Sequence, residues 1–267
     1  MVDRDLLVNR ELLKLEFERA GWIFPSSIWN NLSDYEKSFM IFEFTGKRTL
    51  SNYINRLKYI GFEGLNTVLD AGCGMGQWSV ALSYLNKKIV GIDLNRGRLC
   101  VAVEVANKMG RKNCNFFCGR LENLPFESET FDGIFCYGVL MFTDIPKTLS
   151  EFYRVLKPSG KCYLNANTIG WYMHLIIDRG LKNKNIRIMI DALNMVVRTI
   201  LRKKSFIVVT KNWLMRELKE RNFEIIDIGA EGETSFKKEV LDHKPEPFYP
   251  KSHYGFVSIL EVLVVKK

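Results

Sequence analysis

A glycine-rich turn and one following carboxylate are the residues whose types and spacing best predict chemistry. The apolar segment Thr67–Ala71 runs into the glycines of Gly72–Gly76, and a helix is predicted directly after them. Glycines let a backbone approach a ligand closely, and a helix N-terminus offers unpaired N–H groups to a polar or anionic ligand. Asp93 ends the next predicted strand, where a carboxylate can accept hydrogen bonds from both ribose hydroxyls. Together these features predict a nucleoside site.

The elements that must position these residues alternate between strands and helices. We predict strands at 67–71, 88–93, 115–118, 131–137, 161–166, 223–229 and 256–265. We predict helices at 51–59, 77–85, 94–109, 145–156, 186–201 and 211–222, and a long loop at 230–255. Such alternation is typical of a parallel sheet with helices on both faces. Ligands of open parallel sheets lie outside the carboxyl ends of the strands, which is where the glycine turn and Asp93 stand.

Two segments fall outside this alternation. Residues 1–66 read as a helical cap, and residues 169–204 read as a helical insertion. In the insertion, apolar residues recur at helical spacing: Ile186, Met189, Ile190, Leu193, Val196, Val197, Ile200 and Leu201. We expect this stripe to pack on the core. The alternative is a helix that lies in a membrane interface.

Composition places the chain among ordinary globular proteins. It has 267 residues with 47% hydrophobic and 26% charged residues, which excludes a disordered chain. The net charge is +9, and the excess is concentrated in 179–204, where Asp191 is the one acidic residue among eight basic ones. Such a local field favours an anionic partner. No signal-peptide core is visible, so a cytoplasmic protein is expected, with six reduced, mostly buried cysteines and no metal site.

Several motifs in order resemble the class I S-adenosylmethionine-dependent methyltransferases. Asp70–Gln77 resembles the family's motif I, and Gly119–Phe126 resembles the segment beside the adenine. Phe131–Phe135 is similar to its fourth strand, and Glu151–Gly160 to the helix and turn before its fifth strand. The resemblance implies an α/β, Rossmann-like fold with a seven-stranded, mostly parallel sheet, an N-terminal helical cap and a helical insertion after the fifth strand. It also implies a cap at 1–66 and a methyltransferase domain at 67–267, with 169–204 as a basic lid.

The resemblance also implies roles for individual residues. S-adenosylmethionine would be the cofactor and S-adenosylhomocysteine the product. The implied cofactor-binding residues are Asp70, Gly72, Cys73, Gly74, Gly76, Gln77, Asp93, Leu94, Leu121, Glu122 and Tyr137. Arg120 stands where the family usually has an aspartate that bonds the adenine amino group, and arginine cannot accept that bond. His174, Tyr137 and Tyr172 are the candidate catalytic residues, and Trp171, Arg179 and Arg187 the candidate substrate-binding residues.

The implied reaction is methyl transfer to a small-molecule or glycan-type acceptor, anionic ones included, at oxygen. Alignment and desolvation supply most of the catalysis in such an in-line displacement, so the sequence does not identify a general base. An RNA or other nucleic-acid methyltransferase is one alternative, and a catalytically inactive partner subunit is another. DNA is not expected as a substrate, because Tyr137–Leu140 replaces the Asn-Pro-Pro-Tyr type of tetrapeptide. Peripheral membrane contact through 179–204, the acceptor atom and the oligomeric state stay open.

Overall fold

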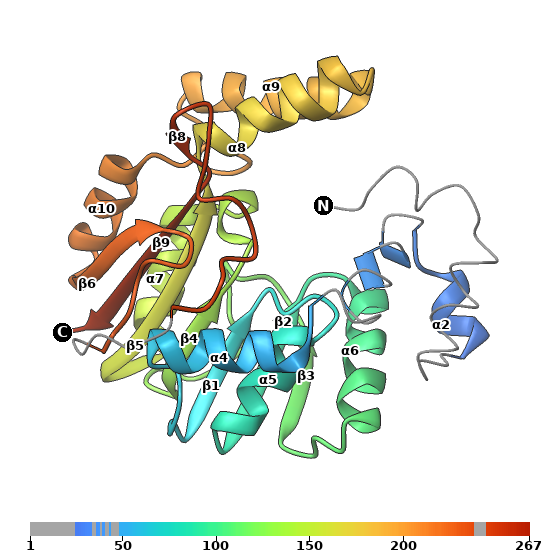
Figure 1. Cartoon of the computed structure of the whole chain (residues 1–267). Coiled ribbons are helices and arrows are strands. Elements are labelled where there is room, and N and C mark those ends of the chain that lie inside the picture. The colour runs from blue at the N-terminus through green and yellow to red at the C-terminus, as the bar shows by residue number, and fades with distance from the viewer. Residues whose placement is uncertain (1–24, 34–35, 38, 41–42, 44–47, 238–243) are drawn as a thin grey trace.

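A seven-stranded sheet in the order β3-β2-β1-β4-β5-β9-β6 forms the centre of the molecule (Figure 1). The computed structural model describes residues 25–33, 36–37, 39–40, 43, 48–237 and 244–267. Its sheet strands are β1 (Thr67–Ala71), β2 (Lys88–Asp93), β3 (Cys114–Cys118), β4 (Phe131–Cys136), β5 (Leu156–Asn167), β6 (Phe223–Ala230) and β9 (Ile259–Lys266). β9 runs antiparallel to β5 and β6, whereas the pairs among β1 to β5 are parallel. The predicted Rossmann-like, mostly parallel sheet is confirmed.

Helices cover both faces of the sheet because successive side chains of a strand point to opposite sides. On β5, Cys162 and Leu164 join one buried cluster, whereas Tyr163 joins the other. The first cluster includes residues of α7 (Ile145–Val155) and α10 (Lys211–Glu220). The second includes residues of α4 (Leu50–Ile60) and α5 (Gln77–Leu85).

Side-chain caps decide where several helices begin. Thr49 and Asn52 form a reciprocal capping box at the start of α4. The Asn95 side chain accepts a hydrogen bond from the Arg98 N–H, so α6 (Arg96–Lys108) begins two residues later than predicted. Asp144 caps α7 in the same way through the Lys147 N–H. The remaining short helices here are α2 (Ser26–Asn30) and the 3₁₀ turn η2 (Leu140–Phe142).

The fifth strand is longer than predicted. β5 begins at Leu156 rather than at Lys161, because the expected turn at Pro158–Gly160 lies within the strand as an irregularity. Ser159 adopts a left-handed φ of 60°, and the register against β4 shifts at this point. A bulge of this kind inserts residues without ending a strand.

The late loop contains a small hairpin that the sequence does not predict. β7 (Ser252–His253) pairs with β8 (Phe256–Val257), and β9 starts only at Ile259, so the single strand predicted at 256–265 is wrong. Tyr254 and Gly255 have φ values of 53° and 79°, which suits the two-residue turns that match strand twist. The hairpin lies directly on Gly170, where a Cβ atom would come within 2.4 Å of the Phe256 and Val257 carbonyl oxygens.

The insertion after β5 is helical, as predicted. It consists of α8 (Ile169–His174), the π-helical segment η3 (Leu175–Lys182) and α9 (Ile186–Ile200), which extends along one end of the molecule (Figure 1). The expectation that its apolar stripe packs on the core is wrong for six of its eight residues, whereas Met189 and Val196 are half-buried. α9 packs through the side that carries Ala192 and Met195, so Ile186, Ile190, Leu193, Val197, Ile200 and Leu201 are exposed.

The prediction of mostly buried cysteines holds for three of the six. Cys73, Cys136 and Cys162 are buried, Cys114 is half-buried, and Cys100 and Cys118 are exposed. All six are unpaired thiols.

Candidate functional site

The glycine turn joins β1 to α5 and is anchored on the end of β2. The Gly72 and Cys73 N–H groups both donate to the Ile92 carbonyl oxygen, at 2.8 and 3.0 Å. Gly72, Gly74 and Gly76 all have left-handed φ values, between 54° and 83°. Only glycine adopts this conformation without steric cost, which explains the three glycines that the sequence places here.

The three glycines serve two different purposes. A Cβ on Gly72 would lie 2.5 Å from a Val139 methyl group, and a Cβ on Gly76 would lie 2.9 Å from the Ala102 Cβ. These two positions are required for close packing of the turn. A Cβ on Gly74 would meet nothing within 4 Å, so the backbone there faces open space that a ligand can occupy.

Asp93 stands at the end of β2 beside the turn. One carboxylate oxygen accepts the Gly74 N–H at 3.0 Å, and the other accepts the Asn95 N–H at 2.8 Å. The carboxylate is thereby fixed in orientation and still half-exposed. Leu94, next in the chain, is exposed and apolar, which is the surface that a base plane needs.

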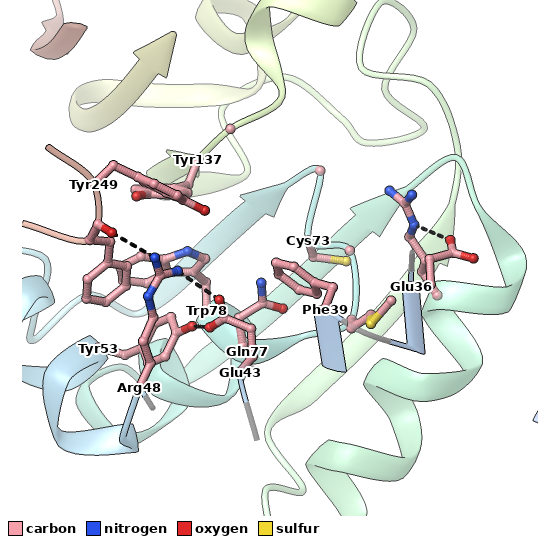
Figure 2. A pocket seen from close by; sticks show the side chains of 16 residues that line it. Glu36, Phe39, Glu43, Arg48, Tyr53, Cys73, Gln77, Trp78, Tyr137 and Tyr249 are labelled. Atoms are coloured by element: carbon pink, nitrogen blue, oxygen red, sulfur yellow. Dashed lines mark hydrogen bonds and ion pairs between the residues drawn. The ribbon is translucent and has the colours of Figure 1, made fainter. Parts of the chain in front are cut away.

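A cavity of about 220 Å³ opens at the turn. Of the predicted cofactor-binding residues, Gly72, Cys73, Gly74, Gln77 and Tyr137 line it, whereas Asp70, Gly76, Asp93, Leu94, Leu121 and Glu122 do not. Figure 2 shows Arg48, Tyr53, Trp78 and Tyr249 on one side of the cavity and Cys73, Phe39 and Glu36 on the other. The buried Gln77 Oε1 atom has no hydrogen-bond partner among the described residues. A buried acceptor without a partner is costly unless a ligand or water supplies the donor.

Asp70 lies behind the turn rather than in the cavity. Its buried carboxylate accepts a hydrogen bond from the Ser79 hydroxyl at 2.5 Å. Burial raises the pKa of Asp70 to about 7, against a lowering by the Ser79 bond. The Asp70–Ser79 hydrogen bond therefore links β1 to α5.

The two residues predicted near the adenine lie after β3. Leu121 is buried in the core beneath the sheet edge. Glu122 accepts the Asp144 N–H at 3.0 Å and faces Arg120 at 3.8 Å. Arg120 itself is exposed.

An arginine that the sequence analysis missed closes one side of the cavity. Arg48 pairs with the buried Glu43 at 2.8 Å and donates to the Phe248 carbonyl oxygen at 2.8 Å. Its guanidinium lies over the rings of Phe248 and Tyr249, at 4.7 and 4.8 Å from their centroids. Burial raises the pKa of Glu43, although the Arg48 charge opposes the shift. This cluster joins the segment before α4 to the late loop, 200 residues apart, and no local motif marks either part.

The half-buried Tyr137, which lines the cavity, pairs with the buried Glu231. The Tyr137 hydroxyl donates to Glu231, and the Tyr137 ring stacks in parallel with Tyr163. The second carboxylate oxygen of Glu231 is buried and has no hydrogen-bond partner in the part of the chain that the structure describes. Burial raises the pKa of Glu231 to about 7, and burial also raises the pKa of Tyr137. A carboxylate poised near neutral pH beside a cavity can accept a proton.

The candidate residues of the insertion form a separate cluster with the hairpin. The rings of His174 and His253 stack at 4.3 Å, and the His174 Nδ1 atom lies 2.8 Å from Asp178. Tyr172 is buried, and no described residue pairs with its hydroxyl. None of these residues lines the cavity. Trp171 connects the two regions, because its ring contacts Tyr249 at 5.4 Å.

The two predicted basic substrate-binding residues, Arg179 and Arg187, both lie in the insertion. Arg179 is half-buried in η3, and Arg187 is exposed in the first turn of α9. Neither lines the cavity at the glycine turn.

Comparisons with known proteins agree with this geometry. Residues 68–160 match the family described as "Methyltransferase domain". A demethylmenaquinone methyltransferase of Lactococcus lactis is 33% identical over 158 residues, which are 57% of this chain and 60% of that protein. The chain therefore matches less than two thirds of that relative's length. An uncharacterized methyltransferase, YcgJ of Bacillus subtilis, is 37% identical over 98 residues, 36% of this chain and 39% of that protein.

Solved structures share the fold. A geranyl diphosphate methyltransferase in complex with SAM superimposes with a TM-score of 0.58. The match covers all of this chain and 96% of that one, at 13% identity.

Proposed function

We propose that this chain transfers a methyl group to a hydroxyl oxygen of a small-molecule acceptor. The premise is that it carries a methyltransferase domain of the class I S-adenosylmethionine-dependent type. The single observation that carries the proposal is the turn at Gly74. Its backbone is open to the cavity, and its N–H is held by the Asp93 carboxylate. The relative from Lactococcus, which is named for a small-molecule acceptor, supports the acceptor class.

The residues present fit the proposed cofactor. Asp93 is oriented to accept ribose hydroxyls, and the open backbone at Gly74 leaves room for the nucleoside. The unpartnered Gln77 Oε1 offers an acceptor to the methionine ammonium group. Leu94, Leu121 and Glu122 are proposed at the adenine end. Asp70 is proposed to act through the turn, since it bonds Ser79.

In this proposal, the residues of the chain accept a proton from the acceptor and exclude water from the cavity. S-adenosylmethionine, when bound, supplies an electrophilic methyl group on its sulfonium. Tyr137 would take the proton of the acceptor hydroxyl while its own proton passes to the Glu231 carboxylate. The negative charge would thus move from Glu231 to the acceptor oxygen, and it would be cancelled when that oxygen gains the methyl group in place of its proton. The pKa of Glu231, about 7, suits this transfer near neutral pH. The aromatic rings of Trp78, Phe248 and Tyr249 surround the cavity and exclude water.

The remaining assignments belong to the same proposal. We also propose residues 1–66 as a cap and 169–204 as a lid on the acceptor side. Half of the first of these segments (1–24, 34–35, 38, 41–42 and 44–47) lies outside the described residues. Trp171 contacts the acceptor from its place beside Tyr249. Arg179 and Arg187 attract anionic or glycan-type acceptors, and His174 and Tyr172 stay secondary catalytic candidates. A cytoplasmic location stays a prediction of the sequence.

Calorimetric titration with S-adenosylhomocysteine tests the proposal, with NAD as the control ligand. We expect binding of the first and none of the second. Asp93→Asn removes one charge-assisted hydrogen bond, so the affinity should fall about tenfold or more. Asp191→Asn, a change at an exposed carboxylate on α9, should leave the affinity unchanged. Binding of neither ligand by the folded protein would contradict the proposal and favour an inactive partner subunit.

A further inference from the structure

The exposed face of α9 is an apolar stripe of unusual length. It consists of Ile186, Ile190, Leu193, Val197, Ile200 and Leu201, and is called the α9 stripe below. The five members within α9 recur every three or four residues, which places them on one face of the helix, and Leu201 follows at its C-cap. Ile186 is 65% exposed and Ile200 is 73% exposed. Contiguous exposed apolar surface of this kind marks an interaction site on a soluble domain.

Positive charge surrounds the α9 stripe. Residues 179–204 hold eight basic residues and one acidic residue, a net charge of +7. Lys182 and Lys184 are exposed before the helix, and Arg187 is exposed in its first turn. Beyond its C-terminal end, Arg202–Lys204 are exposed as well. An apolar face bordered by cations is the pattern of a helix that lies in a lipid headgroup region.

The opposite face of α9 is held by the protein. Ala192 is buried and packs in a cluster with Tyr172 and Val208, and with the half-buried Trp171 and Met195. The helix is therefore formed and oriented before any partner arrives, so binding pays little ordering entropy. A second copy of this chain fits the stripe poorly, because a symmetric contact would bring two segments of charge +7 together.

We infer that the α9 stripe docks on an anionic lipid bilayer, with its apolar side chains among the upper acyl chains and its cations at the lipid phosphates. Within the described residues no helix is long and apolar enough to cross a bilayer. The stripe belongs to the insertion whose Trp171 contacts the cavity-lining Tyr249. This places the proposed acceptor side of the cavity toward the membrane. The docking itself does not depend on the proposed methyl transfer.

Vesicle co-sedimentation of the full chain without cofactor tests this inference. The probes are vesicles of phosphatidylcholine alone and of phosphatidylcholine with 30% phosphatidylglycerol. We expect binding to the anionic vesicles and at least tenfold weaker binding to the neutral ones. Each cation near the surface is worth about fivefold in affinity, so binding should fall steeply as salt shortens the screening length.

Two matched pairs of variants separate the stripe from general surface effects. Val197→Glu should weaken vesicle binding at least tenfold, whereas Val103→Glu, at a valine of similar exposure on α6 (49% against 43%), should not. Arg187→Glu with Lys203→Glu should abolish binding to anionic vesicles. Lys112→Glu with Lys219→Glu changes the net charge equally at other exposed sites and should retain most of it.

Three outcomes would overturn the inference. The first is equal binding to neutral and anionic vesicles, and the second is equal loss in both members of a pair. The third is a dimer in light scattering that Val197→Glu dissociates while no vesicles are bound, which would identify the stripe as an interface between copies. Failure of S-adenosylhomocysteine binding leaves the vesicle result unaffected, so the two proposals fail separately.

Discussion

Replacing Glu231 by glutamine should make the protein more stable at alkaline pH and less active. The carboxyl is buried and accepts one hydrogen bond from Tyr137, and its other oxygen has no partner within the described ranges. Burial raises its pKa from 4.5 to about 7. At 1.36 kcal/mol for each pKa unit, this difference amounts to about 3 kcal/mol.

The sign follows from proton linkage. The folded protein holds the Glu231 proton more tightly than the unfolded chain, so the associated stability is full below pH 4.5 and is lost as pH rises through about 7. Glu231→Gln cannot lose that proton. At pH 5 the free energies of unfolding of the variant and the native protein should differ only by a constant offset. By pH 8 the variant should gain up to about 3 kcal/mol in the free energy of unfolding relative to the native protein.

The assay is urea unfolding of both proteins at intervals from pH 5 to pH 9. Asp70 also has a raised pKa, but it is present in both proteins and cancels in the difference. Glu233→Gln is the control, because that carboxyl is partly exposed, pairs with Lys251 at 3.1 Å and has a lowered pKa. The free energy of unfolding of Glu233→Gln should differ little from that of the native protein, and this difference should not grow above pH 7.

Activity provides the second readout for Glu231→Gln. Loss of a proton acceptor typically costs 10²–10⁴ in rate, while the affinity for S-adenosylhomocysteine should be unchanged. A stability difference that does not vary between pH 5 and pH 9 would refute the reasoning about the buried charge. Full activity in the stabilised variant would refute the proton-transfer role alone.

Three further predictions concern other parts of the structure. Gly74→Ala should fold with a loss of only about 1–2 kcal/mol but lose cofactor affinity, whereas Gly72→Ala, which has no room for a Cβ, should unfold at clearly lower urea concentrations. Gly170→Ala would collide with two carbonyl oxygens, and limited proteolysis should then cleave the displaced hairpin at 252–257. Arg56→Met leaves the buried Glu261 carboxylate without its ion-pair partner and should cost about 3–5 kcal/mol in chemical unfolding, unless Glu261→Gln is introduced as well.

The sequence predicted the sheet well because its strands and turns carry local signals. β1, β2 and α5 fall at the predicted residues, since apolar runs and glycines mark their ends. The β7–β8 hairpin was missed because the Tyr254–Gly255 turn is not among the common hairpin dipeptides. The α9 stripe was assigned to the core because helical periodicity shows that one face is apolar, and not which face the protein covers.

The sequence predicted only those cavity residues that directly follow strands of the sheet. The glycine turn and Tyr137 follow strands of the sheet, so topology alone brings them together. Arg48 and Glu231 come from segments before and after the sheet's parallel half. Their places depend on the packing of α4 and of the late loop, and neither segment carries a motif. The roles of the lid residues His174, Tyr172, Arg179 and Arg187 stay predictions.

The position of β9 has a consequence for synthesis of the chain. β9 lies between β5 and β6, so β6 has no neighbour to pair with until residues 259–266 leave the ribosome. Arg56, buried in α4, finds Glu261 on β9 across 205 residues. A nascent chain that stops short of β9 therefore exposes a sheet edge and holds an uncompensated buried charge. We expect the sheet to close only after β9 is synthesised, so the exposed edges of β5 and β6 are where a stalled chain would meet chaperones or aggregate.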